Sequence, residues 1–247
     1  MAYRIKIDPK KQLKEPDEFI STMERLVLFS RKNVKHLLVG LAIVFAIGVA
    51  YAVFNIKGRM DNNQAVRLEY DASRYYFGSD REKTGQDLKK AIEIYQKIIS
   101  DYSRSSSAPI ASYYLGNAHM EIKEYDAAIN VYKVFLERYP ERRDLVPLVY
   151  QRLGYAYLAK GDNQNALESF NKAAGLELAK NRDQSLYESG RILEQMGNKD
   201  EAIKKYKEII TGFTSSPYSG EAQAKIKGLG GDPVAEEPKK DDQKNKK

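Results

Sequence analysis

The chain has 247 residues, of which 42% are hydrophobic and 30% are charged, a composition sufficient for at least one folded domain with its own core. It contains no cysteine, which excludes a disulfide framework, a thiolate zinc site, a cysteine nucleophile and a lipid-modified cysteine anchor. More than half of the net charge of +7 lies in residues 1–36, where nine Lys and Arg accompany five Asp and Glu, so the rest of the chain lacks the basic balance of a nucleic-acid-binding domain.

Residues 1–36 are predicted to form a cytoplasmic N-terminal arm that contains one amphipathic helix. Pro16, Asp17 and Glu18 form a helix-start signal, because proline fits the first turn and acidic side chains favour the positive end of the helix dipole. Apolar residues between positions 19 and 27 then recur at helical spacing. Two interpretations remain open. The helix lies on the membrane surface or docks onto a membrane partner, or it simply leads into the apolar segment that follows.

The apolar segment from Leu37 to Phe54 contains no charged residue, and Asn55 and Ile56 extend it to a length of about twenty residues. A helix of this length, at about 1.5 Å per residue, crosses a hydrocarbon core of about 30 Å. We therefore predict a transmembrane helix at 37–56. A buried soluble helix would carry a polar face, which this segment lacks. A cleavable signal peptide is the alternative, since Ala50-Tyr51-Ala52 resembles a cleavage site, although a long polar stretch precedes the segment.

The charges that flank the apolar segment predict its orientation. The basic residues before it are Arg25, Arg31, Lys32 and Lys35, and those after it are Lys57, Arg59 and Arg67. This modest excess on the N-terminal side favours a cytoplasmic N-terminus and a large domain on the opposite side of the membrane. For a bacterial chain, the prediction is a single-pass inner-membrane protein with a periplasmic domain.

Three later stretches align with one another without gaps for most of their length: Pro109–Pro140, Pro147–Leu178 and Asp183–Thr214. Each has a glycine, then an alanine, then an aromatic residue at the same relative positions. These columns hold Gly116, Gly154 and Gly190, then Ala128, Ala166 and Ala202, then Tyr132, Phe170 and Tyr206. Small residues let two helices approach closely, and the aromatic residue packs against a neighbouring pair. The pattern therefore predicts an all-α solenoid of stacked helix pairs.

The pattern resembles the tetratricopeptide repeat (TPR), a helix pair of about 34 residues with Leu-Gly-x-x-Tyr, then Ala-x-x-x-Phe, then proline. Leu153-Gly154-Tyr155-Ala156-Tyr157 matches the first half closely, and Pro140 matches the closing proline. The third repeat departs from the pattern at Ser189, before its glycine, and at Thr214, where proline is expected. The resemblance implies a TPR helix-pair solenoid that binds other proteins.

The predicted TPR domain covers residues 57–229. Its first residues belong to a short predicted linker at 55–61, which joins the apolar segment to the first helix of the domain. A degenerate first copy pairs a helix at 62–77 with the segment Ala91–Tyr95, across a polar insert near 79–86. Residues 219–229 are predicted to form a capping helix that ends at Gly230-Gly231-Asp232-Pro233. The remaining segment, 230–247, is rich in Lys, Glu and Asp and is predicted to be a disordered charged tail.

Residues suited to catalysis or metal binding do not form a recognisable constellation. The two histidines, His36 and His119, are far apart in the sequence, and His119 falls at a packing position of the first full repeat. Gly228-Leu229-Gly230-Gly231 lacks the following helix and lysine of a phosphate-binding loop. We therefore predict no enzyme activity, no cofactor, no metal and no small-molecule substrate.

By resemblance to TPR proteins, the first helix of each pair lines a concave face, with the second, fifth, ninth and twelfth positions pointing inward. The candidate peptide groove consists of Ile110, Tyr113, Asn117, Met120, Leu148, Gln151, Tyr155, Leu158, Gln184, Tyr187, Arg191 and Glu194. One TPR subtype binds a C-terminal carboxylate with Lys at the fifth position, and this chain has Tyr or Gln there. Tyrosines and aliphatic residues suit an apolar or extended peptide. Alternatively, these side chains pack within the solenoid.

The whole arrangement, a short arm, one span and a TPR domain, resembles the YfgM-type inner-membrane proteins, which are ancillary subunits of the SecYEG translocon. The resemblance covers residues 1–229 and implies partners among translocon subunits, a periplasmic chaperone or unfolded client proteins. The implied function is a periplasmic chaperone-like factor beside the translocon. The alternative is a structural scaffold subunit of a bacterial envelope complex.

Overall fold

The computed structural model describes residues 18–78, 84–177 and 180–233, and it divides into two compact units, Met1–Arg59 and Met60–Lys247. Within the described residues all regular structure is helical, in the order α1 to α10, and strands are absent. The all-α prediction is therefore confirmed. Of the predicted features, the helix-start residues Pro16 and Asp17, part of the polar insert and most of the charged tail lie outside the described residues.

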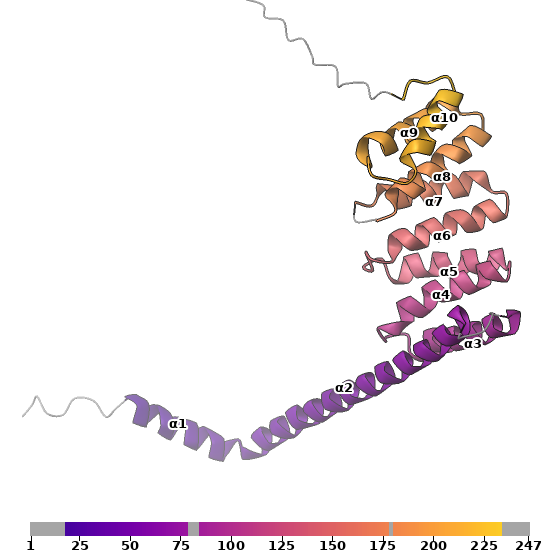
Figure 1. Ribbon diagram of the computed structural model, residues 1–247. Coiled ribbons are helices and arrows are strands. Elements are labelled where there is room, and N and C mark those ends of the chain that lie inside the picture. Colours follow the sequence, from indigo (N-terminus) through magenta and orange to yellow (C-terminus); the bar gives the residue numbers. More distant parts are fainter. Residues whose placement is uncertain (1–17, 79–83, 178–179, 234–247) are drawn as a thin grey trace, which may run out of the picture. The chain divides into compact units, whose positions relative to one another are not determined.

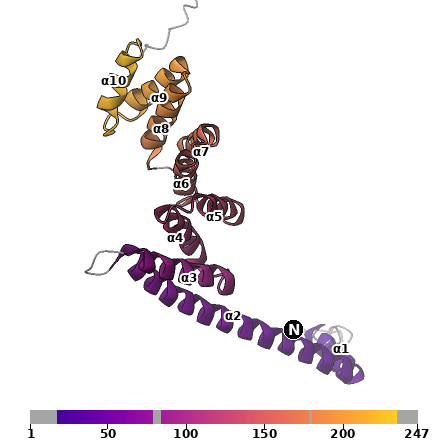
Figure 2. The same cartoon turned by 90° about the vertical axis from the view of Figure 1, so that its right-hand side faces the viewer.

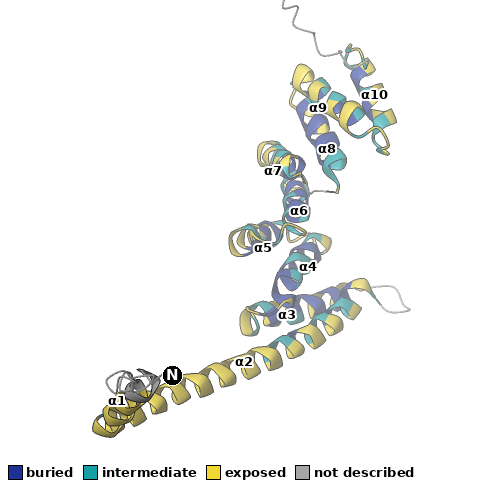
Figure 3. Cartoon of the chain, turned by 90° about the vertical axis from the view of Figure 1, so that its left-hand side faces the viewer, coloured by how far each residue is buried: buried dark blue, intermediate teal, exposed yellow. Residues whose placement is uncertain are grey.

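The first unit contains α1 (Glu18–Lys32) and the N-terminal part of α2 (Val34–Phe77). The predicted helix of the N-terminal arm corresponds to α1. Asn33 lies between the two helices, and its side-chain amide donates to the Phe29 carbonyl over 3.0 Å. The described side chains of α1, and those of α2 through the apolar segment, are exposed almost throughout. Figure 3 shows this part of α2 exposed on all sides.

The predicted linker at 55–61 is helical, because α2 runs from Val34 to Phe77 without a break. The predicted helices at 37–56 and 62–77 are therefore two parts of one helix. The linker contains no proline, and its one glycine, Gly58, costs an exposed helix only about 1 kcal/mol. The Asn55 side chain also donates to the Tyr51 carbonyl over 2.8 Å, so a polar residue after the apolar segment need not end the helix.

The second unit begins with the C-terminal part of α2 and continues as a stack of helices. Each helix contacts its neighbours in chain order (Figures 1 and 2). The helices are α3 (Gly85–Asp101), α4 (Ser107–Glu121), α5 (Tyr125–Arg138), α6 (Val146–Ala159), α7 (Asn163–Gly175), α8 (Arg182–Gln195), α9 (Lys199–Gly212) and α10 (Ser219–Gly228). The three aligned repeats thus become the pairs α4–α5, α6–α7 and α8–α9, and α10 occupies the predicted cap.

The glycine column lets the two helices of each pair approach closely. A Cβ atom built on Gly154 would lie 2.8 Å from the ring of Phe170, and one on Gly190 would lie 2.6 Å from Cε1 of Tyr206. The same contact joins Gly116 to Tyr132. Because all three rings are fully buried, the repeat pattern places a large aromatic side chain where only glycine leaves room for it.

The turns inside the pairs also follow the repeat register. Gly161 and Gly197 have φ angles of 76° and 81°, and Lys123 occupies the equivalent turn of the first pair with φ of 63°. Glycine adopts this left-handed conformation without steric cost, whereas lysine does so less readily. The turn of the first pair is supported by a 2.7 Å contact between Nδ1 of His119 and Oε2 of Glu124. His119 is buried, which agrees with its predicted packing position.

Candidate functional site

The predicted groove residues lie on α4, α6 and α8, the first helices of the three aligned pairs, and the structure buries them unequally. Asn117, Gln151 and Tyr187 are buried and Arg191 is exposed. The half-buried members are Ile110, Tyr113, Met120, Leu148, Tyr155, Leu158, Gln184 and Glu194. We call these twelve residues the inner-helix surface. Its accessible part is therefore a mixture of aliphatic, tyrosine and amide side chains with one exposed cation.

Two residues of the inner-helix surface, Tyr155 and Arg191, contact the carboxylate of Glu188, which lies outside the predicted groove. The Tyr155 hydroxyl donates to Oε1 of Glu188 over 3.3 Å and accepts from Nε2 of Gln184 over 3.0 Å. Arg191 forms an ion pair of 2.9 Å with Oε2 of Glu188. Glu188 is only 8% exposed, so its charge is balanced inside the domain by these contacts.

The environment of Tyr155 affects its ionisation. Burial, followed by the Glu188 carboxylate, raises the pKa of Tyr155 to about 12. The Tyr155 ring also packs edge-on against Phe170, with centroids 5.0 Å apart. The hydroxyl therefore stays protonated at physiological pH and acts as a hydrogen-bond donor and acceptor between α6 and α8.

Two further members of the inner-helix surface make contacts from one repeat to the next. The Gln151 side-chain oxygen accepts a hydrogen bond from Asn181, and the Tyr187 hydroxyl donates to Glu221 on α10. The Tyr187 ring stacks on that of Tyr218 at 5.0 Å. These side chains join successive helix pairs and are not free to contact a ligand in this arrangement. Gln151 and Tyr187 therefore fit the alternative prediction, that the candidate groove residues pack within the solenoid.

Asn117 has a different role, because its partner lies in the same helix pair. Its side-chain oxygen accepts a 2.7 Å hydrogen bond from the hydroxyl of Tyr132, which is fully buried. Burial raises the pKa of Tyr132 well above its ordinary value. The amide of Asn117 thus satisfies a hydroxyl that the glycine column has buried between α4 and α5.

We expect Tyr132→Phe to destabilise the domain by about 1–2 kcal/mol, because Asn117 would keep a buried oxygen without its donor. Tyr139→Phe is the matched control: the Tyr139 hydroxyl is also buried, but it has no hydrogen-bond partner among the described residues. Its removal is expected to be neutral or slightly stabilising. Urea unfolding followed by circular dichroism measures both changes, and equal losses in the two variants would contradict the assignment.

Comparison with known proteins identifies the family that has this architecture. Residues 28–231 match the family described as the tetratricopeptide repeat-like domain. The chain belongs to the tetratricopeptide repeat-like family. A TPR-like domain is in general a scaffold for protein interactions, and so this chain has the fold of a protein-binding module. The resemblance predicted from the glycine, alanine and aromatic columns is thereby confirmed at the level of the repeat family.

Solved structures agree with the TPR-like fold. A tetratricopeptide repeat protein from Parabacteroides merdae is 15% identical, with a TM-score of 0.54, and the match covers 69% of this chain and 60% of that one. TPR-like repeats of a putative kinesin light chain from Podosopora anserina are 14% identical, with a TM-score of 0.52, and cover 67% and 85% of the two chains. At these identities the likeness concerns the fold alone.

A curated relative matches a shorter stretch. The FIS1-related protein fis-1 of Caenorhabditis elegans is 30% identical over 63 residues, which cover 26% of this chain and 44% of that protein. The chain thus spans less than half the length of the curated relative that it matches. In the part of the chain that the structure describes, no group of three or more His, Asp or Glu residues could hold a metal ion.

Two partners of the inner-helix surface, Glu188 and Asn181, were missed by sequence reasoning. Glu188 occupies the sixth position of its repeat and Asn181 precedes its repeat, so both lie outside the second, fifth, ninth and twelfth positions that are predicted to point inward. Between α6 and α8 the sixth position of one inner helix faces the ninth of the preceding one, as Glu188 and Tyr155 show. A polar residue at the sixth position is therefore the signal that could have identified this contact.

Proposed function

We propose that the chain is a membrane-anchored protein-binding module, with the helix at 37–56 as its anchor and the TPR-like domain as its binding part. The observation that carries the proposal is an apolar window in α2 with mean hydropathy 2.7, none of which is buried inside the protein. Leaving apolar surface in water costs about 25 cal/mol per Å². A lipid bilayer would remove that cost, and the window has the length that a hydrocarbon core requires.

The proposed topology has a cytoplasmic N-terminus and a periplasmic TPR-like domain at 57–229. The support is the excess of basic residues before the apolar segment. In this setting we propose a chaperone-like factor that holds extended polypeptide near the protein translocon, with translocon subunits, a periplasmic chaperone or unfolded clients as partners. No small molecule, cofactor or nucleic acid takes part in the proposal.

The accessible part of the inner-helix surface is the proposed peptide groove. Ile110 and Leu148 are half-buried and lie outside the hydrophobic core clusters, so their side chains remain available to an apolar ligand. Tyr113 on α4 and Gln184 on α8 would add polar groups on either side of α6, although Tyr113 already contacts Arg152 and Gln184 already donates to Tyr155. Such a mixture suits an extended segment with apolar side chains and an unpaired backbone.

A scaffold subunit of an envelope complex is the second candidate. The observation in its favour is that Glu188, Tyr187 and Gln151 already have partners inside the domain. A surface whose polar groups are internally paired offers few adaptable contacts to many different clients. A single permanent partner of matching shape needs fewer of them.

The test is photo-crosslinking in living cells from the full chain with a photoreactive residue at Leu148. Many secretory and membrane polypeptides among the adducts would support the chaperone-like function, and one adduct of constant size would support the scaffold. The control carries the photoreactive residue at Lys204, exposed on α9. Equal adducts from both positions would reject the inner-helix surface as the binding site.

The membrane anchor and topology have their own test. In spheroplasts, external protease should degrade the TPR-like domain and leave a short membrane-protected fragment. Extraction of the intact chain by alkaline carbonate would reject the anchor, and complete protection of the domain in intact spheroplasts would reject the periplasmic location.

A further inference from the structure

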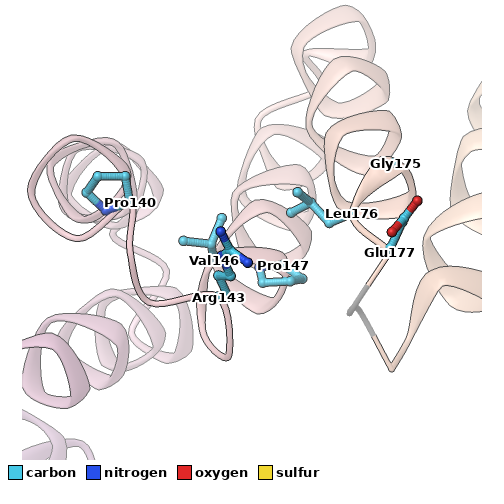
Figure 4. Close-up of a pocket in the computed structure, with 7 residues that line it drawn as sticks. All are labelled: Pro140, Arg143, Val146, Pro147, Gly175, Leu176 and Glu177. Atoms are coloured by element: carbon cyan, nitrogen blue, oxygen red, sulfur yellow. The ribbon is translucent and has the colours of Figure 1, made fainter.

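A pocket that shares no residue with the inner-helix surface lies beside the connections between successive helix pairs. It has a volume of about 490 Å³, within the range of about 300–1,000 Å³ that is usual for ligand pockets. Its walls are the connection from α5 to α6 and the end of α7 with the residues that follow. The lining residues are Pro140, Arg143, Val146, Pro147, Gly175, Leu176 and Glu177 (Figure 4).

The first wall is held in place by contacts that do not involve the pocket. Arg142 donates from Nε and Nη2 to the two oxygens of Asp144, over 2.9 and 2.7 Å. The backbone N–H groups of Leu145 and Val146 both donate to the Arg142 carbonyl over 2.9 Å. Two prolines further restrict the backbone, and Pro147 is buried at the start of α6.

The second wall is tied to the following repeat. The Nε of Arg182 donates to the Ala174 carbonyl over 2.8 Å, and its guanidinium lies over the Phe213 ring, 5.5 Å from the centroid. The C-terminal end of α7 is thus held from α8, and Leu176 is placed opposite Val146, as Figure 4 shows. Both walls are therefore in position without an occupant, which lowers the entropy cost of binding.

The pocket has a mostly apolar lining with one charged side chain on each wall. Pro140, Val146, Pro147 and Leu176 supply the apolar lining, while Arg143 and Glu177 extend from opposite walls (Figure 4). Both charged residues are exposed, and neither has an ion-pair partner among the described residues. Their neighbours Arg142 and Arg182 are occupied by the contacts that build the walls. The two unpaired charges are thus available to a ligand.

We infer that this pocket binds an extended segment of a partner polypeptide, one aliphatic side chain of which enters between Val146 and Leu176. An acidic residue on one side of that side chain would meet Arg143, and a basic residue on the other would meet Glu177. A second copy of the chain fits less well, because a two-fold contact would place the pocket of one copy against the pocket of the other and fill neither. The site is separate from the inner-helix surface and does not depend on the function proposed for it.

The probe is a capped, fluorescent pentapeptide, Glu-Gly-Leu-Gly-Lys, titrated onto the full chain in lipid nanodiscs and followed by fluorescence anisotropy. Replacing its leucine by glycine is expected to weaken binding more than tenfold, since a buried leucine contributes about 1.5–3 kcal/mol. Arg143→Ala and Glu177→Ala are each expected to weaken binding about two- to fivefold, as partly exposed charge pairs do.

Matched controls are Arg138→Ala and Glu141→Ala, which remove the same charges from exposed positions that do not line the pocket. They are expected to leave the affinity unchanged. The inference is overturned if the peptide does not bind, if its leucine is dispensable, or if the controls weaken binding as much as Arg143→Ala and Glu177→Ala do. It is also overturned if the methyl NMR signals of Val146 and Leu176 respond to nanodisc lipid and not to the peptide, which would assign the pocket to lipid.

Discussion

Gly190→Ala is expected to destabilise the TPR-like domain by about 1–3 kcal/mol, the usual range for inserting a methyl group into a well-packed core. The new Cβ would lie 2.6 Å from Cε1 of Tyr206 and 2.7 Å from its Cζ. Tyr206 cannot easily move, because it is fully buried and its hydroxyl donates to Oε2 of Glu194 over 2.7 Å. Since each pair is stabilised by its neighbours, the loss in the pair α8–α9 also weakens the contacts on either side.

The matched control is Gly220→Ala. Gly220 lies within α10, and a Cβ built on it would meet nothing within 4 Å. Because alanine is the better helix former but Gly220 lies in the first turn, this variant should be as stable as the parent chain or gain up to about 0.5 kcal/mol. Chemical denaturation measures both variants. A double variant, Gly190→Ala with Tyr206→Leu, should be less destabilised than the sum of its single changes. The close-packing argument fails if Gly190→Ala is as stable as the parent chain.

The TPR-like domain is expected to unfold in alkali, between about pH 10 and 12. The reason is that several buried tyrosines have a higher pKa in the folded chain than in the unfolded chain. Burial, the largest cause in each case, raises the pKa of nine of the described tyrosines above the ordinary value, and the shift is largest in six of them. They are Tyr76, Tyr95, Tyr132, Tyr155, Tyr187 and Tyr206. Each stabilising contribution is therefore complete below the unfolded pKa of about 10 and is lost as the pH rises toward the folded pKa.

The size of this effect follows from linkage. Between its unfolded and folded pKa values, each such tyrosine lowers the free energy of unfolding by up to about 1.4 kcal/mol per pH unit. Several groups acting together exceed the stability of an ordinary domain, about 5–15 kcal/mol, within one or two pH units. Tyrosinate absorbance and far-ultraviolet circular dichroism should change in the same transition. Full tyrosine ionisation with the helices intact would contradict the prediction.

The sequence by itself determined the repeated helix pairs and their columns of glycine, alanine and aromatic residues. These features follow from local periodicity, since a helix places small and aromatic residues at fixed intervals on one face. The apolar stretch before the repeats was equally evident, because length and absence of charge depend on composition alone. The position of a helix end was not determined in this way: a linker was predicted at 55–61, but the structure continues α2 through it.

Only the tertiary structure decided which inner-helix residues are accessible. Tyr113 and Tyr187 both occupy the fifth repeat position, yet Tyr187 is buried against Tyr218 and Glu221, whereas Tyr113 is only half-buried. Contacts such as Tyr155 with Glu188 depend on how one pair sits on the next. The pocket beside Arg143 depends likewise on the path of two connections. The periodicity of the sequence gives no information on contacts between successive pairs or on the pocket, because both depend on residues that are distant in the chain.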